Sequence, residues 1–176
     1  MSRRGRGFAV LGAALLLVLG AVPISQVADR LLPHAIRLWD TDQCAPSDIS
    51  DHALFGMGAA VLQPGHPDVQ ILDARPLGLS EGAGWRAWVV PVATDGGWTG
   101  SLGTLAPPPG WPDRMAATGA TVSGDRRAQL LLEVWPGPGS TRTAVRGFLV
   151  TYRTAFGIVR TVRTPTTLTT RVGGCA

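Results

Sequence analysis

The sequence predicts an all-β protein, a two-sheet β-sandwich preceded by one N-terminal transmembrane helix. Three observations support this fold class. Short segments of alternating apolar and polar residues recur along the chain, which is typical of strands with one buried face. Glycine (23 residues) and proline (14 residues) separate these segments with turns. Because no long helical period accompanies them, two half-apolar sheets are expected to bury their faces against each other, with a small β-barrel as the alternative.

The N-terminal segment carries the strongest signal in the chain. Arg3, Arg4 and Arg6 precede 22 uncharged residues, 7–28. As a helix, residues 8–27 would extend about 30 Å, the thickness of the hydrocarbon core of a bilayer. Positive charge on the N-terminal side alone predicts a single-pass topology in the cell membrane. Residues 1–7 are then cytoplasmic, residues 8–28 form the transmembrane signal anchor, and the rest is extracytoplasmic.

A cleaved secretory signal peptide is the alternative, because a basic segment followed by an apolar one is typical of both. The cleavage site distinguishes them. None of the positions after Ala21, Ser25 and Ala28 offers the pair of small residues that cleavage requires. No cysteine follows the apolar segment before Cys44, so a lipid-modified N-terminus has no acceptor nearby. An uncleaved anchor is therefore the prediction.

Residues 29–43 are expected to form a juxtamembrane helix or linker. From Asp29 to Thr41 apolar residues recur at helical spacing, and Pro33 is compatible with a first helical turn. This helix either continues the anchor and packs on the domain, or lies on the membrane surface with Trp39 at the interface. The extracytoplasmic β-sandwich domain is assigned to residues 44–176.

The only two cysteines, Cys44 and Cys175, lie at the two ends of this domain. Thiols outside the cytoplasm tend to oxidise, which predicts a disulfide between them. Closing a loop of about 130 residues would contribute on the order of 4 to 5 kcal/mol in the chain-entropy treatment. An intermolecular disulfide and two free thiols are the alternatives. No metal site is predicted, because two distant cysteines lack the close ligand pairs of zinc modules.

About seven strands are expected, with an eighth, weaker segment at the end of the chain. They cover residues 57–63, 69–77, 85–93, 115–122, 128–135, 145–154, 158–164 and 168–172. One short helical turn is expected over residues 48–54, with Ser47 or Ser50 as its N-cap. The turn residues 136–140 and 155–157 are expected to connect three consecutive strands into a meander.

The Gly- and Pro-rich segment 95–112 is the longest without an expected element, and it contains Trp98 and Trp111. Functional loops commonly lie on rigid β scaffolds, and tryptophan is enriched at binding hot spots. Trp98 and Trp111 therefore form the candidate binding surface. The alternative is that both rings fill the end of the sandwich.

No catalytic constellation is visible, and no cofactor is predicted. His34, His52 and His66 lack the spacing of a zinc site, and no phosphate loop, dinucleotide fingerprint or nucleophile elbow is present. His66 and Asp68 are two residues apart, but Pro67 lies between them and favours a turn. The scattered carboxylates are expected on the solvated surface, and no catalytic residue is assigned.

The high isoelectric point, about 10.4, does not predict a nucleic-acid surface. All 16 basic residues are Arg, and outside the cytoplasmic segment 13 Arg face 12 acidic residues. Residues 29–124 hold 5 Arg and 10 acids, whereas residues 125–176 hold 8 Arg and 2 acids. The Thr- and Arg-rich stretch 153–171 is expected to form an exposed strand face; a basic stripe for anionic polymers or lipid headgroups is the alternative.

Residues 130–165, LLLEVWPGPGSTRTAVRGFLVTYRTAFGIVRTVRTP, carry a Leu-rich strand ending in Pro, a Pro-Gly turn and an apolar strand ending in Tyr152-Arg153. With the late Cys175, this pattern resembles uncharacterised, signal-anchored small proteins of high-GC actinobacteria. The absence of Lys and Asn fits such a genome, because their codons are A-rich. The resemblance implies a secreted or membrane-anchored immunoglobulin-like β-sandwich and supplies no catalytic residues.

These observations predict a membrane-anchored extracytoplasmic domain that is a non-catalytic binding or accessory module at the cell surface. Its partners are the membrane, through the N-terminal helix, and an unidentified protein or cell-envelope component, without nucleic acid. One alternative is a small cell-envelope enzyme that uses His52 or His66 with acids brought together by the fold. Another is a purely structural surface protein.

Overall fold

The computed structural model of the chain describes residues 35–47, 52–60, 67–92, 110–124 and 126–175, which belong to one compact unit, Ala35–Ala176. Within these residues the structure has twelve strands and one short 3₁₀ helix, η2 (Trp111–Asp113). The all-β prediction is therefore confirmed. The expected anchor, with Arg3, Arg4 and Arg6, lies outside the described residues. In the described part of the chain no helix has the length and hydrophobicity needed to span a bilayer.

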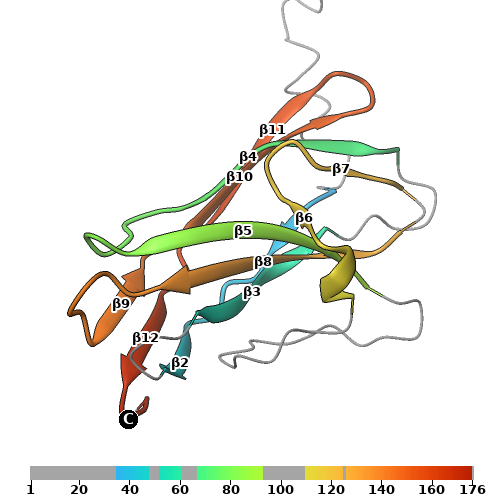
Figure 1. Cartoon of the computed structure of the whole chain (residues 1–176). Helices are drawn as coiled ribbons and strands as arrows, with labels where there is room; N and C mark the ends of the chain where they lie inside the picture. The colour runs from blue at the N-terminus through green and yellow to red at the C-terminus, as the bar shows by residue number, and fades with distance from the viewer. Residues whose placement is uncertain (1–34, 48–51, 61–66, 93–109, 125, 176) are drawn as a thin grey trace, which may run out of the picture. The chain divides into compact units, whose positions relative to one another are not determined.

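The largest sheet has five strands in the order β1-β3-β8-β5-β6, and all neighbours in it are antiparallel (Figure 1). The strands are β1 (Arg37–Leu38), β3 (Ala53–Ala60), β5 (Gly84–Pro91), β6 (Met115–Ala116) and β8 (Ala128–Trp135). β8 is the central strand and pairs along its whole length with β5. This strand therefore positions side chains on both faces of the sheet.

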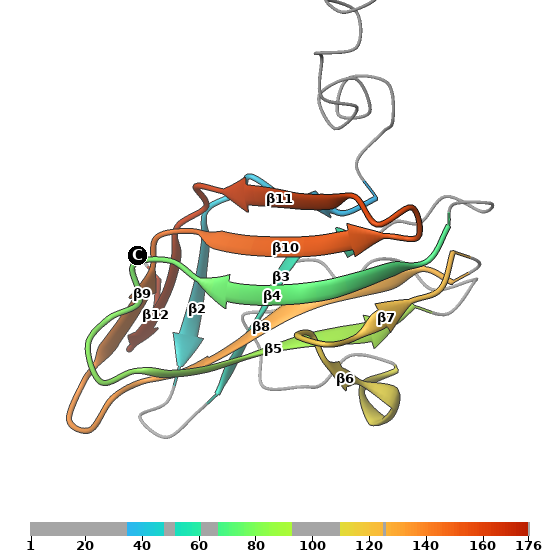
Figure 2. The same ribbon diagram turned by 90° about the horizontal axis from the view of Figure 1, so that it is seen from above.

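Two smaller sheets complete the unit, with orders β11-β10-β4-β7 and β2-β12-β9. The first contains β4 (Val69–Pro76), β7 (Thr121–Val122), β10 (Phe148–Thr154) and β11 (Val159–Thr164). The second contains β2 (Gln43–Ser47), β9 (Arg142–Val145) and β12 (Leu168–Val172), and its β2–β12 pair is parallel. Figure 2 shows β4, β10 and β11 lying across from β5 and β8, with the three-stranded sheet at the end that carries the C-terminus.

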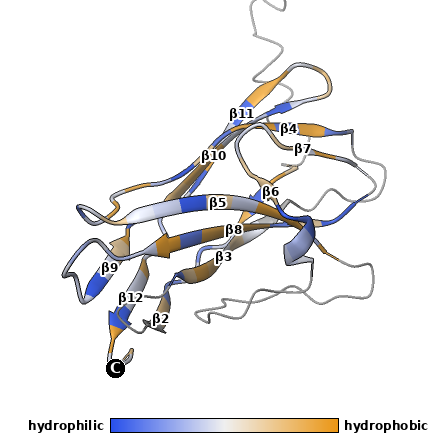
Figure 3. Cartoon of the chain, in the orientation of Figure 1, coloured by the Kyte–Doolittle hydropathy of each residue, from blue (hydrophilic) through white to orange (hydrophobic). Residues whose placement is uncertain are grey.

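One hydrophobic core joins the sheets. Leu130, Leu132 and Val134 of β8 are buried in it, as are Val150 and Tyr152 of β10, in agreement with the expected alternation. Figure 3 shows hydrophobic colours along much of β8, interrupted by hydrophilic bands. The intervening positions of β8 are also buried, including Gln129 and Glu133, which were expected to be exposed. Both faces of this central strand are therefore covered.

The helix expected from Asp29 to Thr41 is wrong for its described part, residues 35–41. Ala35 and Ile36 are buried in the core, and Arg37–Leu38 form β1 on the edge of β3. Pairing with β3 satisfies the backbone of this short segment, and a backbone bond from Trp39 to Met57 continues the pairing. Residues 35–43 consequently belong to the same compact unit as the strands that follow them.

Glycines divide two of the expected strands. Residues 115–122 form β6 and β7 in different sheets, separated by a turn in which Gly119 has φ +88°. Residues 145–154 belong to β9 and β10, again in different sheets, and Gly147 between them has φ +154°. Glycine adopts these conformations without a steric cost. The expected meander is therefore wrong: of β8, β9, β10 and β11, which cover its three expected strands, only β10 and β11 pair as a hairpin within one sheet.

The described part of the expected helical turn over residues 48–54 also differs. Ala53 and Leu54 begin β3, which extends to Ala60, whereas a strand was expected over 57–63. Pairing with β8 from Val134 to Ala128 accounts for this shift, because each residue of β3 that joins the sheet gains backbone hydrogen bonds. Residues 48–51 and 61–66 lie outside the described part.

Candidate functional site

A cluster of aromatic and charged side chains lies on the face of the five-stranded sheet that is turned away from the core. Side chains alternate between the faces of a strand, so Glu133 and Trp135 of β8 share this face, as do Arg86 and Trp88 of β5. The pairing of β5 with β8 places Arg86 opposite Glu133. We call this cluster the aromatic–arginine surface; it consists of His52, Arg86, Trp88, Trp111, Arg114, Glu133 and Trp135.

The carboxylate of Glu133 is the centre of this surface. The Glu133 side chain is only 12% exposed, and both of its oxygens are bonded. Oε1 lies 2.7 Å from Nδ1 of His52, and the indole Nε1 of Trp88 donates a hydrogen bond of 2.8 Å to Oε2. A carboxylate at this depth is costly unless it is hydrogen-bonded. These two partners explain why an acidic residue is tolerated in the central strand.

Two groups of stacked side chains flank Glu133. On one side, the ring of His52 stacks on that of Trp135 with centroids 4.7 Å apart and an angle of 16° between the planes. The guanidinium of Arg86 lies 5.5 Å from the centroid of Trp135. Each of these contacts fixes the indole of Trp135 relative to the sheet.

On the other side of Glu133, Trp88 and Trp111 meet edge to face with centroids 5.9 Å apart. The guanidinium of Arg114 lies 5.0 Å from the centroid of Trp88 and 4.5 Å from that of Trp111. It also donates a hydrogen bond of 3.1 Å to the carbonyl oxygen of Trp111. Glu133 therefore connects two aromatic–cation groups that come from β5, β8, the η2 segment and His52, the residue just before β3.

Two glycines make this arrangement possible. Gly84 pairs with Trp135, and a Cβ atom at Gly84 would overlap the Trp135 ring. The missing side chain therefore lets the indole lie across β5. Gly110 precedes η2 with φ +84°, and a Cβ there would approach the carbonyl oxygen of Pro91 to 2.5 Å. This glycine allows the chain to turn and place Trp111 beside Trp88.

The His52–Glu133 pair resembles two parts of a nucleophilic catalytic system, in which a carboxylate orients an imidazole. The His52 side chain is 48% exposed, and no Ser, Thr or Cys side chain among the described residues hydrogen-bonds to it. Two hollows of about 330 and 210 Å³ in the described part are lined by neither His52 nor Glu133. No group of three His, Cys, Asp or Glu suited to a metal ion occurs among the described residues.

The structure places one of the two predicted binding residues in this surface. Trp111 is partly exposed beside Trp88 and is not part of the hydrophobic core. Trp98, His34 and His66 lie outside the described residues. Asp68 accepts hydrogen bonds from the Ser123 hydroxyl and from the backbone N–H of Gly124, which link the residue before β4 to the segment after β7.

Sequence reasoning missed Glu133, Trp88 and Trp135 as members of a site. The alternation of β8 was recognised, but its polar positions were interpreted as solvated. The contacts of Glu133 depend on the register of β8 with β3 and β5, which join residues 45 and 81 positions apart. The one local signal is a glycine, Gly84, at the start of a strand that contains two tryptophans.

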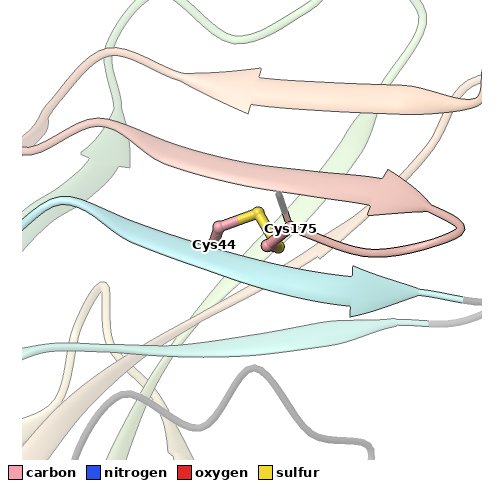
Figure 4. Close-up of a disulfide and its surroundings, with 2 residues drawn as sticks. All are labelled: Cys44 and Cys175. Atoms are coloured by element: carbon pink, nitrogen blue, oxygen red, sulfur yellow. A yellow bond between two sulfur atoms is a disulfide. The ribbon is translucent and has the colours of Figure 1, made fainter.

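The predicted disulfide is confirmed (Figure 4). Cys44 and Cys175 are joined with their Cα atoms 5.9 Å apart and 131 positions apart in the sequence. Cys44 lies in β2, whose parallel partner β12 ends three residues before Cys175. The covalent bond thus holds the last strand next to the first part of the domain.

Comparison of the chain with protein-family models, with curated proteins and with solved structures finds no match.

Proposed function

We propose that this chain is a single-pass membrane protein whose extracytoplasmic domain is a non-catalytic binding module at the cell surface. The aromatic–arginine surface is its recognition face. Residues 8–28 form the anchor, and the packed sheets form an immunoglobulin-like β-sandwich similar to that of signal-anchored actinobacterial proteins. The disulfide supports an extracytoplasmic location, because such bonds persist in oxidising compartments.

The observation that carries the proposal is the pair of aromatic–cation groups joined by Glu133. Trp and Arg are the residue types most enriched at binding hot spots. Here Trp88, Trp111 and Trp135 are partly exposed, and each is held by at least one cation or hydrogen bond. Side chains that are already ordered lose little conformational entropy when a partner binds. The surface is therefore suited to binding a protein or envelope component.

The His52–Glu133 distance favours one second candidate, a small cell-envelope hydrolase with His52 as its base. This candidate requires a nucleophile or a bound water beside His52. Substitution His52→Gln would abolish the activity of such an enzyme, whereas a binding module would have no hydrolytic activity to lose. Assay of both chains against model esters and peptides separates the two functions.

Membrane attachment is tested by carbonate extraction of native membranes. We expect the full-length chain to stay in the pellet and a protease added outside the cell to reach the domain. Release of the intact chain into the carbonate supernatant would contradict the anchor.

Recognition is tested by photo-cross-linking of the full chain in its native membrane. A photoreactive residue replaces Pro112, which is exposed next to Trp111; the matched control replaces Thr161, which is exposed on the four-stranded sheet. We expect a discrete adduct from position 112 and none from position 161. Equal labelling from the two positions, or none from position 112, would remove the support for this recognition face.

A further inference from the structure

Ala35, the first described residue, lies at the end of the domain that carries the turn between β10 and β11, residues 155–158. From residue 41 onward the N-terminal segment runs alongside the C-terminal one in the same direction. The backbone N–H of Thr41 donates to Oγ1 of Thr166, that of Gln43 donates to the carbonyl oxygen of Thr167, and β2 is parallel to β12. Following this course backward places Ala35 toward the beginning of β11. Figures 1 and 2 show this start and the β10–β11 turn at one end, and the C-terminus at the other.

The β10–β11 turn exposes apolar side chains that the domain does not cover. Phe156 is 74% exposed and Val159 is 52% exposed, two of the four exposed large hydrophobic residues in the described part. The turn is well defined: Thr154 N–H donates to the carbonyl oxygen of Ile158 at 2.9 Å, and Gly157 adopts φ +77°. Phe156 is therefore held outward on a fixed hairpin.

Three exposed arginines lie at the same end of the domain as this apolar tip. Exposed Arg153 pairs with Val159 in the ladder, and exposed Arg126 and Arg127 lie at the same end, just before β8. From residue 148 to 164 the hairpin contains three Arg and no acidic residue. Asp68 and Asp113 are the described acids near this end, and Asp68 is engaged by Ser123 and Gly124. An apolar tip with exposed arginines at the same end of the domain has the chemistry of a contact with an anionic membrane surface.

We propose that the β10–β11 tip docks on the outer surface of the membrane that holds the chain. Phe156 enters the interfacial layer, while Arg153, Arg126 and Arg127 face the phosphates of anionic lipids. This inference rests on the proposed anchor: the six residues 29–34 span at most about 22 Å when extended, which keeps the tip near the bilayer. The His52–Trp135 stack belongs to the opposite end, where β3 begins and β8 ends, and so stays accessible to a partner.

The test uses the full chain, with Phe156→Cys carrying an environment-sensitive fluorophore, reconstituted in vesicles. The matched control carries the label at Pro138→Cys, an exposed turn position at the opposite end. Vesicles contain phosphatidylcholine alone or with phosphatidylglycerol, and lipid-borne quenchers report contact with the bilayer. We expect quenching at position 156 in anionic vesicles and much less at position 138. Each of Arg153→Gln, Arg126→Gln and Arg127→Gln should lower the equilibrium constant for docking about fivefold at low salt.

Flotation of the same vesicles separates the two proposals. A chain that floats but shows equal, water-like emission at positions 156 and 138 overturns the docking of the tip and leaves the anchor intact. A chain that does not float overturns the anchor and, with it, the docking. Equal quenching at position 156 with and without phosphatidylglycerol contradicts the assigned role of the arginines.

Discussion

The two faces of β8 show two different ways of burying a strand. On the core face, Leu130, Leu132 and Val134 are stabilised by non-directional apolar burial. On the other face, Glu133 and Trp135 are held by hydrogen bonds and ring stacking, which depend on direction and distance. The core face therefore supplies stability, whereas the outer face supplies a fixed arrangement of polar and aromatic groups.

The largest expected effect comes from the core face. Leu132→Ala removes a fully buried side chain and should lower the free energy of unfolding by about 3 kcal/mol, because the cavity cannot collapse completely. Urea unfolding of the full chain in detergent, followed by circular dichroism, measures this change. Cross-linking from position 112 should persist wherever the variant is folded. Loss of cross-linking in a folded Leu132→Ala chain would mean that the two faces are coupled.

A smaller effect is expected from the carboxylate. Glu133→Ala leaves the N–H of the partly exposed Trp88 without its acceptor and should cost about 2 kcal/mol. Glu133→Gln should cost about half as much, because its side-chain carbonyl can still accept the bond from Trp88. The same unfolding measurement ranks the three variants. A larger loss of unfolding free energy for Glu133→Ala than for Leu132→Ala would contradict the conclusion that the core face supplies most of the stability.

Gly84→Ala is expected to change geometry more than stability. The added methyl group would displace the ring of Trp135, which is partly exposed and can turn toward solvent, so the cost should be about 1 kcal/mol. Separation of the rings should remove the ring-current shift of His52 in its proton NMR spectrum. An unchanged His52 shift would show that Trp135 does not need the space above Gly84.

Arg114→Lys should have the smallest effect on stability, about 0.5 kcal/mol, because the exposed guanidinium contributes through its contacts with Trp88 and Trp111. Binding is expected to suffer more than folding, since a flexible ammonium does not hold the two rings in place. The cross-linking yield from position 112 measures binding, and urea unfolding measures stability. Equal proportional losses in the two quantities would identify Arg114 as a structural residue.

Local patterns predicted the all-β class, the strands over 69–77, 85–93 and 128–135 to within a residue or two, and the disulfide. They did not predict where glycines end a strand: Gly119 and Gly147 each separate strands of different sheets. They also did not predict the contacts of Glu133, because cross-strand register is set by packing of the whole domain. Trp111 was predicted as a binding residue, whereas its neighbours Trp88 and Arg114 required the structure.

The most direct test of the recognition face is cross-linking from position 112 in the chain that carries Trp111→Ala together with Arg114→Ala. Both side chains lie outside the hydrophobic core, so circular dichroism and the disulfide should be unchanged. The control is Thr161→Ala, on the exposed face of the four-stranded sheet. The binding-module proposal predicts that the adduct disappears in the double variant and persists in the control. An adduct of undiminished yield in a folded double variant would contradict it.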